Sequence, residues 1–305
     1  MINKLLVIAA GRGSRLNHLT SSTPKPLMEV CGLTLIERLL LTAKKAGITE
    51  FHIVVGYERE KLKDFLQSRN IVQKINFIDN EEWEKSNGVS VLKAKKYMGS
   101  SSFLLSMCDH IFQPDNFSML IKQEPRLSEY KSILAVDSKY KSKPWIDLDD
   151  ATKVRLSQNN IEAIGKQITP YDALDTGLFL CTPAVFDYLE KAYKEKNDCS
   201  LSEGMTCLIQ EKKLSYMDVG TNYWCDVDTA TDIRNAEGVL LRSCKKSTDG
   251  LISRNFNRYV STAISRHLCK TSLTPNQISV AVFGVGIASF FFLISRSYWM
   301  FLIGL

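Results

Sequence analysis

The stretch LVIAAGRGSRL, at residues 6–16, joins an apolar run directly to a glycine-containing loop. The run Leu5–Ala9 predicts a buried strand. Gly11 and Gly13 allow the backbone of the loop to approach a phosphate chain, whose oxygens accept N–H bonds. Arg15 adds a planar set of donors that suits phosphate. The spacing is neither GxGxxG nor GxxxxGK[ST], so a second element is needed to define the ligand.

That second element is TPKPL, at residues 23–27. Pro24 and Pro26 stiffen the backbone on either side of Lys25 and hold its ammonium near the same phosphates. A solvated lysine on a surface turn is the plain alternative. The two elements together favour a phosphate site.

Short apolar runs alternate with amphipathic stretches through the first part of the chain. The pattern predicts further strands at Phe51–Val55, Ile75–Asp79, Phe103–Met107, Ser132–Val136, Gly177–Cys181 and Leu214–Asp218. It predicts helices at Leu33–Ala46, Glu58–Ser68 and Val89–Tyr97. We therefore expect an α/β fold over residues 1–242, a Rossmann-like and mostly parallel sheet with helices on both faces.

Two acidic segments indicate a metal site. Asp109 follows an apolar strand in FLLSMCDHIF, so it lies at the end of a strand where open α/β sheets bind ligands. Asp226 and Asp228 precede a helical stretch in WCDVDTATDIRNAE. Carboxylates that converge on Mg²⁺ suit phosphoryl chemistry. A helix cap or a turn is the alternative for Asp109 and for Asp228.

Composition limits the remaining classes. The chain has 305 residues and a formal net charge of +6, which suits anionic substrates or an anionic membrane surface. No basic stripe with interleaved aromatic residues occurs in the first 240 residues, so we expect no nucleic-acid partner. The eight cysteines lack zinc spacing and predict reduced thiols of a cytosolic domain. The four histidines are dispersed and receive no role.

The composition changes near residue 243. Residues 243–253 predict a linker. Apolar and basic residues then alternate as in a helix that lies on a membrane surface, with the apolar face formed by Phe256, Tyr259, Val260, Ala263, Ile264 and Leu268. Charge around that face comes from Arg254, Arg258, Arg266 and Lys270. Ile278–Ile294 contains no charged residue and predicts a membrane span, which makes 254–305 a membrane segment. The basic residues before the span predict a cytoplasmic catalytic domain and a membrane location.

The N-terminal motifs resemble those of the sugar-phosphate nucleotidyltransferases, whose opening signature is L-x-A-A-G-x-G-x-R-L followed by T-P-K-P-L. The resemblance covers roughly residues 1–240. It implies that Arg15 and Lys25 stabilise charge as pyrophosphate leaves, and that Asp109 with Asp228, or with Asp226 as the alternative, binds Mg²⁺. The implied nucleotide contacts are Ala9, Ala10, Gly11 and Gly13, with Asn87, Gly88 and Ser90 at the nucleobase. The implied acceptor contacts are Lys166, Asp175, Thr176 and Gly177.

The C-terminal part is similar to the start of the CDP-alcohol phosphotransferase family. A cytidylyltransferase fused to such a domain resembles bifunctional proteins that make CDP-inositol from inositol 1-phosphate. The resemblance implies CTP and a small phospho-alcohol as substrates, and it permits a homodimer through the membrane segment. DGLISR at Asp249–Arg254 echoes the phosphotransferase signature but lacks its aspartates, so no catalysis is assigned to it.

Other readings stay open at this point. The acceptor can be phosphocholine, glycerol phosphate or a hexose 1-phosphate, or the NTP can differ. A non-catalytic nucleotide-sensing module of a membrane protein and an NAD-binding Rossmann protein are further alternatives. The missing GxGxxG motif counts against the latter.

Overall fold

The computed structural model of the chain describes residues 2–13, 15, 23–244, 258–269, 271, 273–295 and 297–304. Side chains are described over the same ranges except at 258–260, 275 and 304. The chain divides into two compact units, Met1–Leu240 and Leu241–Leu305.

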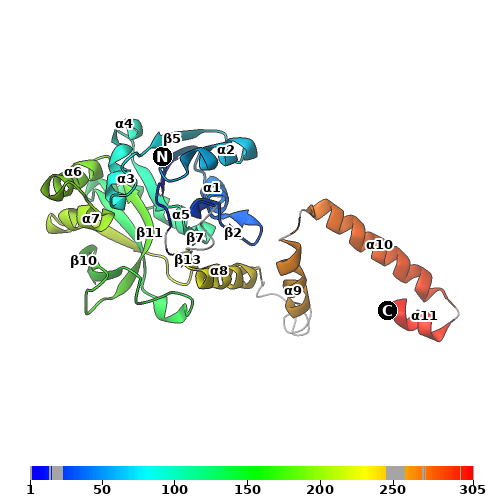
Figure 1. Cartoon of the computed structure of the whole chain (residues 1–305). Helices are drawn as coiled ribbons and strands as arrows, with labels where there is room; N and C mark the ends of the chain where they lie inside the picture. The colour runs from blue at the N-terminus through cyan, green and yellow to red at the C-terminus, as the bar shows by residue number, and fades with distance from the viewer. Residues whose placement is uncertain are drawn as a thin grey trace. The chain divides into compact units, whose positions relative to one another are not determined.

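A mixed sheet of nine strands forms the centre of the first unit (Figure 1). Its strands lie in the order β5 (Ile75–Asp79), β4 (Glu50–Val55), β1 (Lys4–Ala9), β6 (Phe103–Met107), β11 (Ala173–Cys181), β8 (Ser132–Asp137), β12 (Leu214–Asp218), β10 (Asn160–Gly165) and β9 (Lys153–Ser157). The four strands from β5 to β6 pair in parallel, as predicted. β11 and β10 run opposite to their neighbours, so the sheet is mixed and the prediction of a mostly parallel sheet was wrong for its second half.

Helices cover both faces of the sheet, which confirms the predicted α/β architecture. Leu5 and Val7 of β1 belong to one core, and Leu6 and Ile8 belong to the other. This division follows from the alternation of side chains along a strand, and it explains why β1 reads as a continuous apolar run. One core packs under α1 (Leu35–Lys45), α2 (Arg59–Arg69) and α5 (Pro114–Ile121). The other packs under α3 (Asn87–Lys93), α4 (Lys95–Met98), α6 (Val185–Lys196) and α7 (Leu201–Gln210).

Two predicted helices have different bounds. The helix expected at Leu33–Ala46 begins at Leu35, because Thr34 caps it: the Thr34 Oγ1 accepts from the Glu37 N–H at 3.2 Å, and Glu37 accepts from the Thr34 N–H at 2.9 Å. Residues Leu33–Thr34 form β3 instead, paired with β2 (Glu29–Val30). The helix expected at Val89–Tyr97 is divided into α3 and α4.

A small two-stranded sheet sets the position of the acidic segments. β13 (Trp224–Asp226) pairs antiparallel with β7 (His110–Phe112), and α8 (Ala230–Ser243) follows β13. A third apolar cluster fixes this arrangement by packing side chains of α8 against β7 and β2; it includes Val30, Ile111, Val227, Ala236 and Val239. Short 3₁₀ helices in the described part of the unit include η2 (Lys25–Leu27), η3 (Glu124–Ser128) and η4 (Tyr140–Ser142).

The second unit contains α9 (Arg258–Leu268), α10 (Pro275–Leu293) and α11 (Tyr298–Gly304). Among the described residues, one helix is long and apolar enough to cross a membrane, at Asn276–Leu293 with a mean hydropathy of 1.7. The 19 residues of α10 span about 28 Å at 1.5 Å each. Of the predicted linker 243–253, only Ser243 and Cys244 are described; Asp249–Arg254, Phe256 and Lys270 also lie outside the described residues.

Candidate active site

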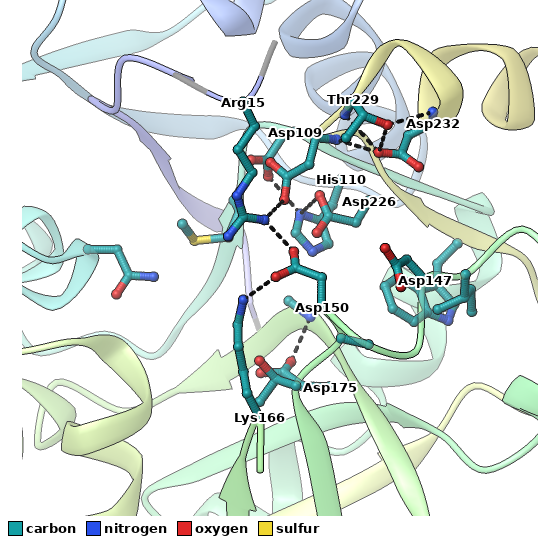
Figure 2. A pocket seen from close by; sticks show the side chains of 18 of the residues that line it. Arg15, Asp109, His110, Asp147, Asp150, Lys166, Asp175, Asp226, Thr229 and Asp232 are labelled. Atoms are coloured by element: carbon teal, nitrogen blue, oxygen red, sulfur yellow. Dashed lines mark hydrogen bonds and ion pairs between the residues drawn. The ribbon is translucent and has the colours of Figure 1, made fainter. Parts of the chain in front are cut away.

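A cavity of about 690 Å³ opens at the edge of the sheet where β1 and β6 end (Figure 2). Its wall contains many of the predicted site residues, namely Arg15, Asn87, Asp109, Lys166, Asp175, Gly177, Asp226 and Asp228. These residues come from segments far apart in the sequence. The fold therefore assembles in one place the groups that the motifs singled out.

Lys25 is the buried cation of this site. Its side chain is 8% exposed, and its Nζ lies 2.5 Å from Oδ2 of Asp109 and 2.5 Å from Oδ1 of Asp228. Burial alone would lower the pKa of Lys25, but the surrounding carboxylates, Asp109 first among them, outweigh burial and raise it. Lys25 therefore stays an ammonium and links the TPKPL turn to both acidic segments.

The glycine loop makes room for Lys25. Gly13 has a φ of +69°, and a Cβ added there would lie 2.6 Å from Cβ of Lys25. A side chain at this position is thus excluded by both conformation and space. Gly11 is exposed, whereas Ala9 and Ala10 are buried at the end of β1. The role of these four residues in nucleotide binding stays a prediction.

Asp150 lies between two cations of the cavity (Figure 2). Its Oδ2 accepts a hydrogen bond from Nη1 of Arg15, and its Oδ1 accepts one from Nζ of Lys166 at 2.5 Å. The same Nη1 of Arg15 donates to Oδ2 of Asp228 at 2.9 Å. Burial raises the pKa of Asp150, but the bonds from Lys166 and Arg15 outweigh it and lower the pKa. Charges of alternating sign thus run from Lys166 to Lys25.

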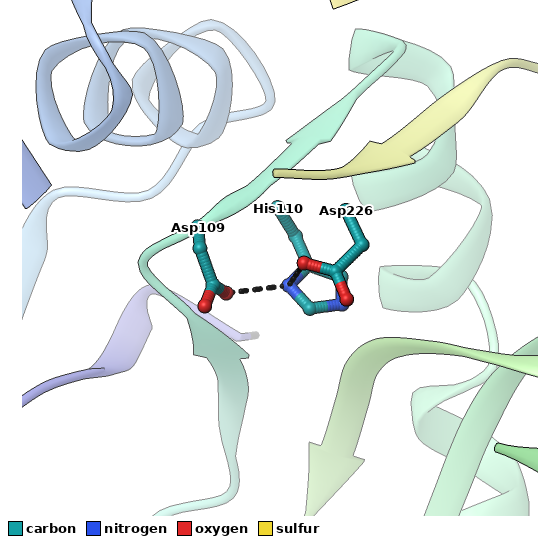
Figure 3. A group of neighbouring side chains, drawn as sticks. All are labelled: Asp109, His110 and Asp226. Carbon is teal, nitrogen blue, oxygen red and sulfur yellow. Dashed lines mark hydrogen bonds and ion pairs between the residues drawn. The ribbon is translucent and has the colours of Figure 1, made fainter. Parts of the chain in front are cut away.

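Asp109, His110 and Asp226 form a second group in the cavity (Figure 3). His110 and Asp226 are partners in the β7–β13 pairing, and Asp109 directly precedes β7. Nδ1 of His110 lies 2.7 Å from Oδ1 of Asp109 and 3.9 Å from Oδ1 of Asp226. Burial disfavours the imidazolium, but the two carboxylates outweigh burial and raise the pKa of His110 to about 9. Near neutral pH, His110 therefore donates a hydrogen bond to Asp109.

The pKa values of the two carboxyl groups in this cluster are shifted in opposite directions. Burial opposes the ionised form of Asp109, but Lys25 and His110 outweigh burial and hold its pKa well below its usual range. The pKa of Asp226 is raised to about 6, because burial dominates over the attraction of His110.

These side chains fit a divalent cation. One ligand atom from each of Asp109, His110 and Asp226 lies within 4.8 Å of the other two. Oδ1 of Asp226 is buried and has no hydrogen-bond partner among the described residues. Mg²⁺ prefers oxygen ligands, so Asp109 and Asp226 suit it better than a protonated imidazole. Asp228, which the sequence favoured as the metal ligand, pairs with Lys25 and Arg15, and the choice between Asp228 and Asp226 stays a prediction.

The start of β11 packs against the same cluster. Gly177 has a φ of +74°, and a Cβ added there would lie 2.7 Å from Nε2 of His110. Oδ1 of Asp175 accepts from the Gly177 N–H at 2.7 Å, and burial raises the pKa of Asp175 to about 6. Thr176 points away from these groups: it is fully buried and donates to the carbonyl of Ala135 at 2.7 Å. Thr176 therefore holds β11 to β8.

Of the three residues predicted to contact the nucleobase, Asn87 lines the cavity, whereas Gly88 and Ser90 pack against the protein. Asn87 lines the cavity, and its Oδ1 accepts from the Leu201 N–H at 2.8 Å. Gly88 provides close packing, because a Cβ there would lie 2.6 Å from the carbonyl oxygen of Cys199. Ser90 is buried and accepts from Nδ2 of Asn80 at 2.9 Å. The structure thus gives Gly88 and Ser90 packing contacts, and their part in base recognition stays a prediction.

Sequence patterns gave no role to four charged residues that line the cavity, His110, Asp147, Asp150 and Asp232. His110 received no role, although it directly follows the predicted ligand Asp109 and precedes an apolar pair. Asp150 lies in KPWIDLDDAT, at residues 143–152, where the combination of a tryptophan with three aspartates is the one signal that marks the segment. Trp145, Asp147 and Thr152 of this segment also line the cavity.

The chain is similar to known proteins over most of its length. Residues 4–242 match the family model for nucleotidyl transferases. A bifunctional IPC transferase and DIPP synthase from Aquifex aeolicus is 33% identical over 291 residues, which cover 95% of this chain and 64% of that protein. A protein of the same description from Thermococcus kodakarensis is 32% identical, over 94% of this chain and 62% of its own length. The chain thus spans just under two thirds of the length of these relatives.

Solved structures show the same fold. The inositol-1-phosphate CTP transferase from T. maritima superposes with a TM-score of 0.68 at 25% identity, covering 78% of this chain and 96% of that one. A UDP-glucose pyrophosphorylase in complex with UDP-glucose also gives a TM-score of 0.68, at 18% identity and with 80% and 100% coverage. The latter likeness is one of fold alone.

The contact between Gly177 and His110 leads to a first prediction. Gly177→Ala should lower kcat/KM by about 10²-fold, because the added methyl group displaces the imidazole and the Asp109 carboxylate that it holds. Gly99→Ala is the matched control, since Gly99 also has a positive φ but a Cβ there meets nothing within 4 Å. Steady-state kinetics and thermal melting of both variants separate the two effects. Equal activity in the two variants would contradict the assigned role of the contact.

Proposed function

Because this chain belongs to the nucleotidyltransferase family, we propose that it converts CTP and inositol 1-phosphate to CDP-inositol and pyrophosphate with the help of Mg²⁺. The observation that carries the proposal is that Arg15 and two acidic segments line one cavity, with Lys25 bonded to both acidic segments. The names of the relatives, IPC transferase and inositol-1-phosphate CTP transferase, support the choice of substrates.

The proposed reaction needs charge neutralisation and positioning more than proton transfer. A phosphate oxygen of the acceptor attacks the α-phosphorus of CTP and forms a new O–P bond. The bond between the α-phosphorus and the bridging oxygen breaks, and pyrophosphate leaves with that electron pair. The acceptor phosphate is already a dianion near neutral pH, so no strong general base is required. No covalent enzyme intermediate is required either.

Each residue of the site has its own role in the proposed reaction. Lys25 and Arg15 stabilise the charge that develops on the pyrophosphate, and Lys166 binds the acceptor phosphate. Asp175 and Gly177 border the acceptor. His110 orients the Asp109 carboxylate through its 2.7 Å contact. When held by Asp109 and Asp226, Mg²⁺ supplies positive charge to the phosphate oxygens.

We also propose that residues 1–242 form a cytoplasmic catalytic domain and that 254–305 attach it to a membrane. The support is α10, whose large apolar side chains are exposed along its length; Phe283 is 69% exposed and Phe291 is 62% exposed. Its length of about 28 Å is close to the roughly 30 Å thickness of a bilayer core. Exposed apolar surface of this extent favours burial in lipid over contact with water.

The second prediction tests the reaction. Wild-type protein with Mg²⁺, each of the four NTPs and a panel of phospho-alcohols should release pyrophosphate fastest with CTP and inositol 1-phosphate. Lys25→Met should lower kcat/KM by about 10²-fold or more, because a preorganised cation is lost. Lys139→Met, which removes an exposed lysine, should be neutral. If phosphocholine, glycerol phosphate or a hexose 1-phosphate is turned over faster, that compound is the acceptor in place of inositol 1-phosphate. Binding of CTP without turnover would indicate a sensing module.

The third prediction separates the two carboxylates that follow β13. Asp109→Asn and Asp226→Asn should each raise the Mg²⁺ concentration for half-maximal rate by at least about tenfold, because each removes a charged ligand. Asp228→Asn should lower kcat with little change in the Mg²⁺ requirement, since its partners are Lys25 and Arg15. The reverse pattern for Asp226 and Asp228 would restore Asp228 as the metal ligand.

The fourth prediction concerns the second unit. The 305-residue chain should co-sediment with lipid vesicles or require detergent, because the exposed apolar side chains of α10 would otherwise contact water. A chain that ends at Arg242 should stay in the supernatant and retain cytidylyl transfer with a similar KM for CTP. A full-length chain that is monodisperse in plain buffer would contradict membrane attachment.

A further inference from the structure

The segment between η4 and β9 forms one wall of the cavity. It contributes the lining residues Trp145, Ile146, Asp147, Asp150, Ala151 and Thr152. Within it, Asp150 bonds to two cations that come from different parts of the fold: Arg15 from the loop after β1 and Lys166 directly after β10. The reaction described above gives Asp150 no role.

We propose that Asp150 is a positioning residue that fixes the spacing between Arg15 and Lys166, and thereby between the phosphates of the two substrates. The inference rests on the proposed function, in which Arg15 faces the nucleotide phosphates and Lys166 the acceptor phosphate. Both substrates are anionic where they must meet, so they repel each other at the reacting distance. A fixed spacing between their two cations holds them in the geometry of attack.

Asp150 can keep both bonds while the phosphates bind. Its bond to Arg15 uses Nη1, and a guanidinium carries five N–H donors in a fixed plane. An ammonium such as that of Lys166 has three donors. Each cation therefore has the capacity to bond to Asp150 and to a phosphate at the same time. Asp228 also bonds to Nη1 of Arg15, which extends the connection to Lys25 and the metal-binding carboxylates.

The negative charge of Asp150 should weaken the binding of phosphates, although its proposed positioning role favours catalysis. Arg15 and Lys166 carry two positive charges, and the carboxylate between them reduces the sum to one. All three side chains are partly exposed, at 52% for Arg15, 48% for Lys166 and 35% for Asp150. Removing the carboxylate should therefore strengthen attraction for phosphates modestly, while the two cations lose their common anchor. Weaker catalysis with undiminished binding is the signature of this arrangement.

The test compares Asp150→Asn with Asp149→Asn in the full-length chain. Asp149 is an exposed neighbour on the same segment and is not among the residues that line the cavity. In Asp150→Asn, kcat should fall by about tenfold or more, with no rise in KM for either substrate. Asp149→Asn should match the wild type. Unchanged kcat, a raised KM at unchanged kcat, or an equal loss in Asp149→Asn would each overturn the proposal.

A double-mutant cycle identifies the partner through which Asp150 acts. Asp150→Asn should cost much less in kcat when Lys166 is already replaced by methionine, because one end of the bridge is then missing. Additive losses would mean that Asp150 acts independently of Lys166 and would overturn the proposed bridge.

Binding of inorganic pyrophosphate with Mg²⁺ provides a readout that does not depend on CTP or on the acceptor. By isothermal titration, Asp150→Asn should bind pyrophosphate about two- to fivefold more tightly than the wild type, whereas Asp149→Asn should not. Unchanged or weaker binding of pyrophosphate would overturn the proposal that Asp150 bridges Arg15 and Lys166. If the wild type fails to turn over CTP with inositol 1-phosphate, the proposed substrates are wrong, and this titration still decides the role of Asp150.

Discussion

The buried ammonium of Lys25 is the interaction on which the site depends. It lies 2.5 Å from carboxylate oxygens of both Asp109 and Asp228, which come from segments that would otherwise repel each other. Removing one partner from a buried ion pair leaves an uncompensated charge and typically costs about 3–5 kcal/mol. The TPKPL turn, the end of β6 and the stretch after β13 are therefore held in one place by a single charge. Gly13 is required in the loop for the same reason, because no side chain fits between it and Lys25.

The reversal of β11 completes the cavity. β11 pairs antiparallel with β6, with Leu178 opposite Ser106, so the start of β11 lies where β6 ends. This arrangement brings Asp175 and Gly177 to the edge that carries Asp109. An apolar run such as Gly177–Cys181 predicts a buried strand but contains no information about its direction, which depends on the partners available in the folded sheet. The parallel half of the sheet was predictable, because strands there alternate with helices that impose a right-handed crossover.

The difference between local motifs and contacts that are distant in sequence also explains which candidate site residues could be identified from the sequence. Arg15, Lys25 and Asp109 lie in motifs where neighbouring residues carry the chemistry, so local pattern was sufficient. Asp150 bonds to partners that are distant in sequence, Arg15 and Lys166, and no local pattern encodes those pairings. His110 adjoins its partner Asp109, but its charge also depends on Asp226, which is distant in sequence. Conversely, Gly88, Ser90 and Thr176 adjoin predicted ligand-binding positions but contact the protein itself, because neighbouring residues of a helix or strand point in different directions.

The balance of charge in the cavity bears on the proposed use of Mg²⁺. Its wall contains seven aspartates, Asp109, Asp147, Asp150, Asp175, Asp226, Asp228 and Asp232, against the cations Arg15 and Lys166 and the protonated His110. Lys25 does not line the cavity but adds one more positive charge through its contact with Asp109. A triphosphate and a phosphomonoester would enter a site that is already acidic, where each carboxylate repels them. A divalent cation held by Asp109 and Asp226 would offset the charge of those two carboxylates near the phosphates. The acidic wall is therefore consistent with a metal that is needed to bind the nucleotide as well as to transfer it.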